Sequence, residues 1–136
     1  QKRNMPESQT LKKEERIYLR SELNELFASR GSFVCYPFRV VYLEVPRQEL
    51  PLKMMVSVPK RRLKHAVDRN RIKRLTREAY RLTKKELVEQ IDPEVTLLIG
   101  FIYLKDRLSR YSTVQQAVEE ALKKLQPPTK EPVEDD

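Results

Sequence analysis

Residues 95–104 read VTLLIGFIYL, and this run contains no charged residue. β-Branched, aromatic and leucine side chains dominate it, and Asp92-Pro93 precedes it as a turn signal. A nearly continuous apolar run of this length is typical of a strand that is covered on both faces. We therefore expect residues 95–104 to form the most buried strand of a sheet.

A helix and a tail are expected downstream of this strand. Ser112 and Gln115 match a capping box, in which the two side chains satisfy backbone N–H groups at a helix start. Apolar residues recur at helical spacing up to Leu125, and two prolines follow shortly after. Residues 126–136 are rich in proline and acidic residues, so we expect a disordered tail.

Two more strands are expected earlier in the chain. FRVVYLEV at 38–45 and LKMMVSV at 52–58 are rich in β-branched and aromatic residues, and prolines flank them. Because only a short proline-containing turn separates them, we expect an antiparallel hairpin. Residues 33–36 or the stretch around Lys53 could supply an additional short strand, and the sequence leaves this open.

A strongly basic segment lies between the second and third of these strands. Asp68 is expected to N-cap a helix that runs to about Gln90. Its apolar stripe, which would pack on the sheet, consists of Ile72, Leu75, Ala79 and Leu82. Both flanks of the stripe are cationic: one holds Arg69, Lys73, Arg77 and Lys84 with Tyr80 among them, and the other holds Arg71, Arg74, Arg81 and Lys85.

A short helix is expected to open the folded part of the chain. Ser21 can N-cap it, apolar residues follow at helical spacing, and Gly31 can end it after Arg30. We expect a flexible polar arm over residues 1–20, one domain over 21–125 and the tail described above. The order of elements indicates a single-domain α+β two-layer sandwich, as 136 residues also favour.

The positive charge is concentrated in one place. The chain has 28 basic and 20 acidic residues, for a net charge of +8. Between Lys60 and Lys85 there are twelve basic and two acidic residues, so this segment alone carries +10 and the rest of the chain −2. Such concentration is typical of a protein that binds a polyanion. The alternative is a solvated basic helix without a partner, although like charges at this density repel one another.

The composition argues against a catalytic site made of protein side chains. Cys35 is the single cysteine and His65 the single histidine, so neither an internal disulfide nor a zinc cluster is expected. His65 lies inside the basic run, which suits it poorly as the base of a nucleophile. The two glycines are too few for a phosphate-binding loop. No apolar run would span a bilayer and no leader opens the chain, so we expect a cytoplasmic protein.

Seven aromatic residues fall on the first helix and the strands: Phe27, Phe33, Tyr36, Phe38, Tyr42, Phe101 and Tyr103. Phe38 and Tyr42 alternate onto one sheet face, which favours core packing. An exposed subset would instead be able to stack on unpaired bases.

The basic segment also resembles a known family. VPKR at 58–61 is followed by AVDRNRIKRLTREAYR at 66–81, which closely resembles the Arg-Asn-Arg signature of the protein subunits of bacterial ribonuclease P. The order of helices and strands from about Leu19 through Leu125 is similar as well.

The resemblance implies a fold in which the motif helix lies in an unusual left-handed crossover, as in the second domain of ribosomal protein S5. It implies an endonuclease ribonucleoprotein in which an RNA subunit, with Mg²⁺, removes the 5′ leader of precursor tRNA during tRNA processing. The protein would be an RNA-binding cofactor with no catalytic residue and no metal of its own. Its partners would be ribonuclease P RNA and precursor tRNA, and the free protein would be monomeric.

The resemblance also carries residue roles. Contacts to the catalytic RNA would be made by Arg69, Asn70, Arg71, Lys73, Arg74 and Arg77, with Arg62 and Lys64 from the preceding loop. The single-stranded leader would lie in a cleft lined by Phe27, Tyr42, Ser57, Lys60 and Arg61. Asn70 adds no charge, so it would make specific hydrogen bonds, either to RNA or to its own helix start.

Two other functions are alternatives, and composition alone does not exclude the first of them. A general binder of structured RNA, with no enzymatic assembly, would use the same basic helix. A DNA-binding protein with this helix in a major groove would need several uncharged side chains that read bases, whereas the exposed positions here are nearly all cations.

Overall fold

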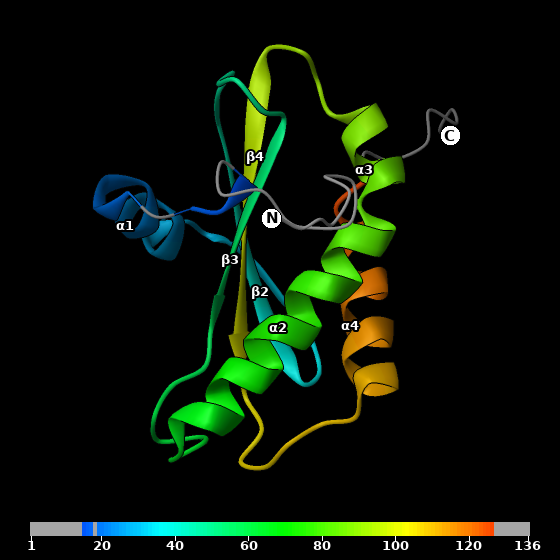
Figure 1. Ribbon diagram of the computed structural model, residues 1–136. Helices are drawn as coiled ribbons and strands as arrows, with labels where there is room; N and C mark the ends of the chain where they lie inside the picture. The colour runs from blue at the N-terminus through cyan, green and yellow to red at the C-terminus, as the bar shows by residue number, and fades with distance from the viewer. Residues whose placement is uncertain (1–14, 18, 127–136) are drawn as a thin grey trace, which may run out of the picture.

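The computed structural model describes residues 15–17 and 19–126, and the elements follow one another as an α+β domain (Figure 1). In chain order they are α1 (Arg20–Ala28), β1 (Gly31–Cys35), β2 (Phe38–Pro46), β3 (Leu52–Ser57), α2 (Ala66–Thr83), α3 (Lys85–Gln90), β4 (Val95–Tyr103) and α4 (Tyr111–Lys124). The extra strand that the sequence left open is therefore present, as β1.

The four strands form one mixed sheet in the order β1-β2-β4-β3. β4 lies between an antiparallel neighbour, β2, and a parallel neighbour, β3. Seven of its nine residues are buried, which confirms the prediction that this run is the most buried strand. A parallel pair needs a long crossover connection, and α2 with α3 supplies it.

The predicted hairpin of residues 38–45 and 52–58 is wrong. β2 and β3 do not pair with each other, because the more apolar β4 lies between them, and the hairpin partner of β2 is β1. A connection of a few residues is long enough to cross one strand, since neighbouring strands are only about 4.8 Å apart. Thr96 of β4 fixes this connection: its Oγ1 accepts a hydrogen bond from the Gln48 N–H at 2.8 Å and donates one to the Leu50 carbonyl at 2.7 Å.

The sheet separates two layers of helix. α2, α3 and α4 cover one face and α1 covers the other, as Figure 1 shows with the sheet seen nearly edge-on. The larger core lies under α2 and α4 and includes Phe38, Phe101, Tyr103, Ile72 and Val118. The smaller core lies under α1 and consists of Ile17, Leu26, Val41 and Leu98, with half-buried neighbours such as Leu23 and Met55.

The basic helix differs from its prediction in which residues it buries. Its buried residues are Ile72, Thr76, Ala79 and Tyr80, whereas Leu82 is 54% exposed. Thr76 fits this apolar face because its hydroxyl donates to the Ile72 carbonyl at 2.7 Å. Tyr80 is fully buried and so does not belong to a cationic flank. The helix also ends earlier than predicted, at Thr83, and α3 begins after Lys84 and runs to Gln90.

The predicted caps are not formed. Asp68 lies inside the first turn of α2, whose N-cap is His65, and Ser21 lies inside α1, whose N-cap is Leu19. Ser112 lies inside α4, whose N-cap is Arg110. The N-caps of the three helices lie two or three residues before the predicted caps, because packing, rather than a single hydroxyl or carboxylate, determines where a helix begins.

Most of the predicted arm, residues 1–14 and 18, and most of the predicted tail, residues 127–136, lie outside the described residues. Residues 15–17 belong to the predicted arm but lie along the open edge of β3. Arg16 forms a parallel bridge with Met54, and the Ile17 N–H donates to the Met54 carbonyl at 2.9 Å. No helix in the described ranges is long and apolar enough to cross a membrane.

Candidate nucleic-acid interface

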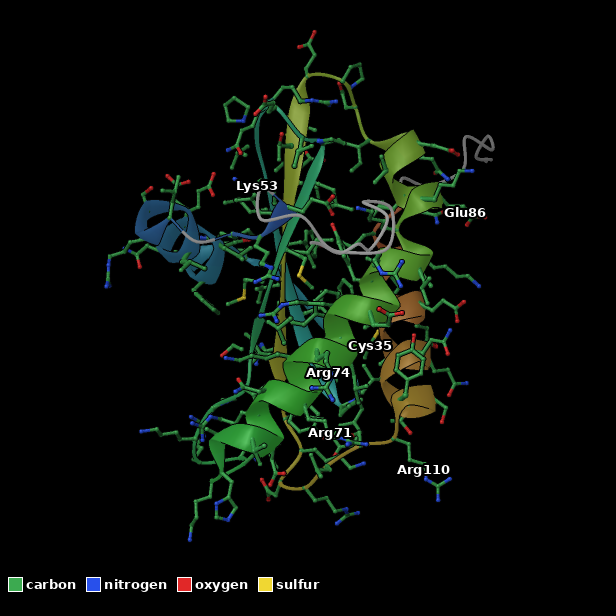
Figure 2. All side chains as sticks on the ribbon, in the orientation of Figure 1. Cys35, Lys53, Arg71, Arg74, Glu86 and Arg110 are labelled. Carbon is green, nitrogen blue, oxygen red and sulfur yellow. The ribbon has the colours of Figure 1, made fainter. Side chains whose placement is uncertain are left out.

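The outer side of α2 carries the predicted RNA-binding side chains. Asn70, Arg71 and Arg74 are exposed, and Figure 2 shows both arginines projecting from the helix. Within the described part of the chain, no hydrogen bond or ion pair engages these three side chains. Because Ile72 and Thr76 anchor the opposite side in the core, the arginines are held on a rigid helix with their donors free for a ligand.

Arg69 has a different role from its neighbours in the motif. Its Nη1 donates to the backbone carbonyls of Leu63 at 3.0 Å and Lys64 at 2.9 Å. These contacts fold the β3–α2 loop, residues 58–65, back onto the first turn of α2. Arg69 is therefore a positioning residue for this loop, and only its remaining donors are available to RNA.

Arg77 and Lys73 are half-buried on α2. Burial lowers the pKa of Arg77, and the nearby charge of Arg16 lowers it further. Arg16 is exposed on the edge of β3, so a cation from the start of the chain lies near the motif helix. Arg16 is not among the predicted site residues, because the polar sequence around it predicts a flexible arm.

The β3–α2 loop holds the four predicted basic residues together. Lys60, Arg61 and Lys64 are exposed, and Arg62 is half-buried. The Arg62 Nη1 donates to Asp106 Oδ1 at 3.0 Å, which ties this loop to the β4–α4 loop, residues 104–110. The family resemblance divides these four residues between two RNA partners, whereas the structure brings them together at one end of the domain.

The predicted leader cleft is not assembled as one surface. Tyr42 lies on the sheet face under α4, where its ring is half-buried and 5.8 Å from the Phe33 ring centroid. Ser57 is two residues from Met55, which packs in the α1 core, so Ser57 lies on the other face. Phe27 is 48% exposed on α1. The thickness of the sheet therefore separates Tyr42 from Ser57.

Most of the other aromatic residues are packed. Phe38, Phe101 and Tyr103 are buried, and the Phe38 ring makes edge contacts to the other two at 5.6 and 5.7 Å. This confirms core packing for these rings. Tyr36 is 63% exposed at the β1–β2 turn.

Two other residues have defined places. His65 is exposed at the start of α2, and Cys35 is buried in the core, where burial raises the pKa of its thiol. Among residues 15–17 and 19–126, no three His, Cys, Asp or Glu side chains are grouped as they would be around a metal ion.

Comparison with known proteins agrees with this geometry. The ribonuclease P family matches residues 11–126. A ribonuclease P protein component from Porphyromonas gingivalis is 43% identical over 114 residues, covering 82% of this chain and 83% of the relative. A ribonuclease P protein component from Chlorobium phaeobacteroides is 31% identical over 110 residues, covering 74% and 75%.

Solved structures show the same fold. The RNase P protein from Thermotoga maritima superposes with a TM-score of 0.64 at 23% identity, covering 83% of this chain and 99% of that one. A Staphylococcus aureus RNase P protein mutant with defective mRNA degradation activity gives 0.63 at 25% identity, covering 82% and 87%. With the motif on an exposed helix and a family match over most of its length, the chain belongs to the ribonuclease P protein family.

Proposed function

We propose that this chain binds ribonuclease P RNA through the outer side of α2 together with Arg62 and Lys64 of the β3–α2 loop, and that it binds the 5′ leader of precursor tRNA through a separate set of residues. As a component of the ribonuclease P ribonucleoprotein it acts in tRNA 5′ maturation. The observation that carries the RNA-binding role is the set of exposed motif side chains, Asn70, Arg71 and Arg74, without partners in the described chain. Arginine binds phosphate with two parallel hydrogen bonds and is enriched where phosphate is recognised.

In this proposal the RNA subunit carries out the hydrolysis with Mg²⁺, and the protein contributes binding. The cationic face of α2 would neutralise the closely spaced phosphates of a folded RNA. Lys73 and Arg77 are half-buried on the same helix and would contact RNA with their terminal charged groups. Such contacts would lower the ionic strength and Mg²⁺ concentration that the assembly needs to fold and bind its substrate.

We place the leader against the α1 face of the domain. Phe27 offers an exposed ring for stacking on an unpaired base, and Ser57 offers a hydroxyl on the same side of the sheet. Lys60 and Arg61 continue from the end of β3 and would contact phosphates of the leader. Tyr42 is left out of this surface because its ring lies on the opposite face of the sheet, against the larger core.

The test of the function is cleavage of a precursor tRNA by a bacterial ribonuclease P RNA at low Mg²⁺, with and without the full chain. We expect the protein to stimulate release of the 5′ leader, and we expect no cleavage when the RNA is omitted. Tight RNA binding without stimulation, with a compatible RNA, would instead identify a general structured-RNA binder. Competition by duplex DNA as effective as that by structured RNA would favour the DNA-binding alternative.

Phe27→Ala is expected to reduce the preference of the assembled enzyme for precursor over mature tRNA by about 10-fold, because one base–aromatic stack is lost. Tyr42→Ala is expected to lower the affinity of the assembled enzyme for precursor and mature tRNA by the same factor. It should also lower the free energy of unfolding by about 2 kcal/mol, because a half-buried ring is removed from the core. Binding of both tRNAs and urea unfolding measure these effects. A loss of precursor preference in Tyr42→Ala alone would contradict the placement of the leader.

A further inference from the structure

Two loops that are distant in sequence are locked together at one end of the domain. The Arg62–Asp106 ion pair joins the β3–α2 loop to the β4–α4 loop. Tyr103, the last residue of β4, holds the second loop: its hydroxyl donates to the Arg107 carbonyl at 2.6 Å and lies 2.7 Å from Ser109 Oγ. Since Arg69 holds the first loop, both walls of the space between them are fixed before any ligand binds.

A cavity of about 600 Å³ lies between these loops, and we call it the basic basin. It is lined by Lys60, Arg61, Arg62, Leu63, Lys64, His65, Asp68, Asp106, Arg107 and Leu108. Five of these residues are Lys or Arg and two are acidic, and one of the acids, Asp106, is already paired with Arg62. The basin therefore has an excess of positive charge.

The cations of the basin are available to a ligand. Lys60, Arg61, Lys64 and Arg107 are exposed and make no side-chain hydrogen bond or ion pair with the described residues. The Nε of Arg62 is buried and lacks a hydrogen-bond partner. Several cations held close together without partners repel one another, and an anion that entered would relieve this repulsion.

We infer that the basic basin binds an RNA phosphodiester backbone, and that Arg107 of the β4–α4 loop is a phosphate-binding residue that shares the basin with Lys60 and Arg61. Leu108, which is 41% exposed at the rim, would contact a ribose or a base edge. The inference rests on the proposed function for the identity of the RNA. It adds a second RNA-binding segment, which lies outside the Arg-Asn-Arg motif and 20 residues or more beyond the charge-rich segment.

The test compares Arg107→Gln with Arg110→Gln in the full chain. Arg110 is exposed, lies three residues further on at the start of α4 and is not part of the basin lining, so it is a control of equal charge (Figure 2). We expect Arg107→Gln to weaken binding of ribonuclease P RNA about 5- to 10-fold near 0.1 M salt. The slope of log affinity against log salt concentration should fall by about one. Arg110→Gln should change both values much less.

A second experiment, which measures tRNA binding by the assembled enzyme, identifies which RNA occupies the basin. If Arg107→Gln weakens binding of ribonuclease P RNA and leaves tRNA binding by the assembled enzyme unchanged, the basin binds the catalytic RNA. If the assembled enzyme instead loses affinity for precursor but not mature tRNA, the basin binds the leader, and either result supports a phosphate site. Equal behaviour of Arg107→Gln and Arg110→Gln in both assays, with a wild-type protein that stimulates cleavage, would overturn the inference. A wild-type protein that stimulates nothing would count against the proposed function instead.

Discussion

Replacing Arg71 and Arg74 together by glutamine is expected to lower the affinity for ribonuclease P RNA about 100-fold. Both side chains are exposed on α2 and have no partner in the described chain, so the change removes ligand contacts without removing core contacts. A hydrogen bond to a charged group contributes about 1.5–3 kcal/mol, and two are lost here. The salt dependence of log affinity should decrease by about two, as expected for two phosphate contacts.

The control for this variant is Lys85→Gln/Lys123→Gln, which removes the same charge from α3 and α4. Both lysines are exposed and lie on the lining of a shared surface depression, away from the outer side of α2. Unfolding of both double variants in urea should stay within about 0.5 kcal/mol of the wild type, because surface changes of this kind seldom cost more. If the control loses as much RNA affinity as Arg71→Gln/Arg74→Gln, attraction by net charge explains the binding and the outer side of α2 is not the interface.

Lys53→Met is expected to lower the free energy of unfolding by about 3 kcal/mol. The Lys53 Nζ lies 3.0 Å from Glu22 Oε1 and donates to Gln48 Oε1 at 2.9 Å, and the Gln48 amide donates to Glu22 Oε2 at 2.7 Å. The side chains of Lys53 and Glu22 are only 11% and 10% exposed. Methionine would leave the Glu22 carboxylate buried without its cation, and an unpaired buried charge is costly.

A double-mutant cycle isolates this effect. Glu22→Gln/Lys53→Met removes both charges and should be at least about 1 kcal/mol more stable than Lys53→Met alone, because no charge is then left buried. Urea unfolding of the wild type, the two single variants and the double variant gives the coupling energy. Additive single effects would show that the ion pair does not fix α1 on the sheet. Because α1 carries Phe27, we also expect Lys53→Met to reduce the preference for precursor tRNA.

Several features followed from local chemistry and were predicted correctly. The apolar run of β4, the basic helix and the last helix each have a period or a composition that neighbouring residues impose. The assignment to the family followed from the motif at 66–81. Core packing of Phe38 and Phe101 followed from strand alternation, which places both rings on one face.

The incorrect predictions have one common cause, which is that tertiary packing overrode the local pattern. β2 and β3 are adjacent in sequence and were predicted to pair, but pairing depends on which strand buries most apolar surface, and β4 takes the central position between them. Tyr80 was assigned to a cationic flank from helical angles alone. Its neighbours on α2 are basic, yet the packing of α2 against α4 and the sheet encloses its ring.

The candidate site likewise combines features that local sequence determines with features that only tertiary contacts determine. Sequence identified Arg71 and Arg74 because their positions on a helix determine that they share a side. The resemblance divided Lys60 and Arg61 from Arg62 and Lys64, and it did not include Arg107, whose loop is joined to the β3–α2 loop by the Arg62–Asp106 pair. Lys105, Arg107 and Arg110 follow β4 in the sequence, but no local pattern indicates what these residues face in the fold.

The sequence by itself determined the type and order of nearly all elements, the concentration of charge and the family, because these depend on residues close together along the chain. The tertiary structure alone decided the strand order, the sheet face of Tyr42, the structural use of Arg69 and the meeting of two loops at the basic basin. These depend on contacts between distant residues, and such contacts are selected by the burial of apolar surface in the whole chain rather than by any local preference.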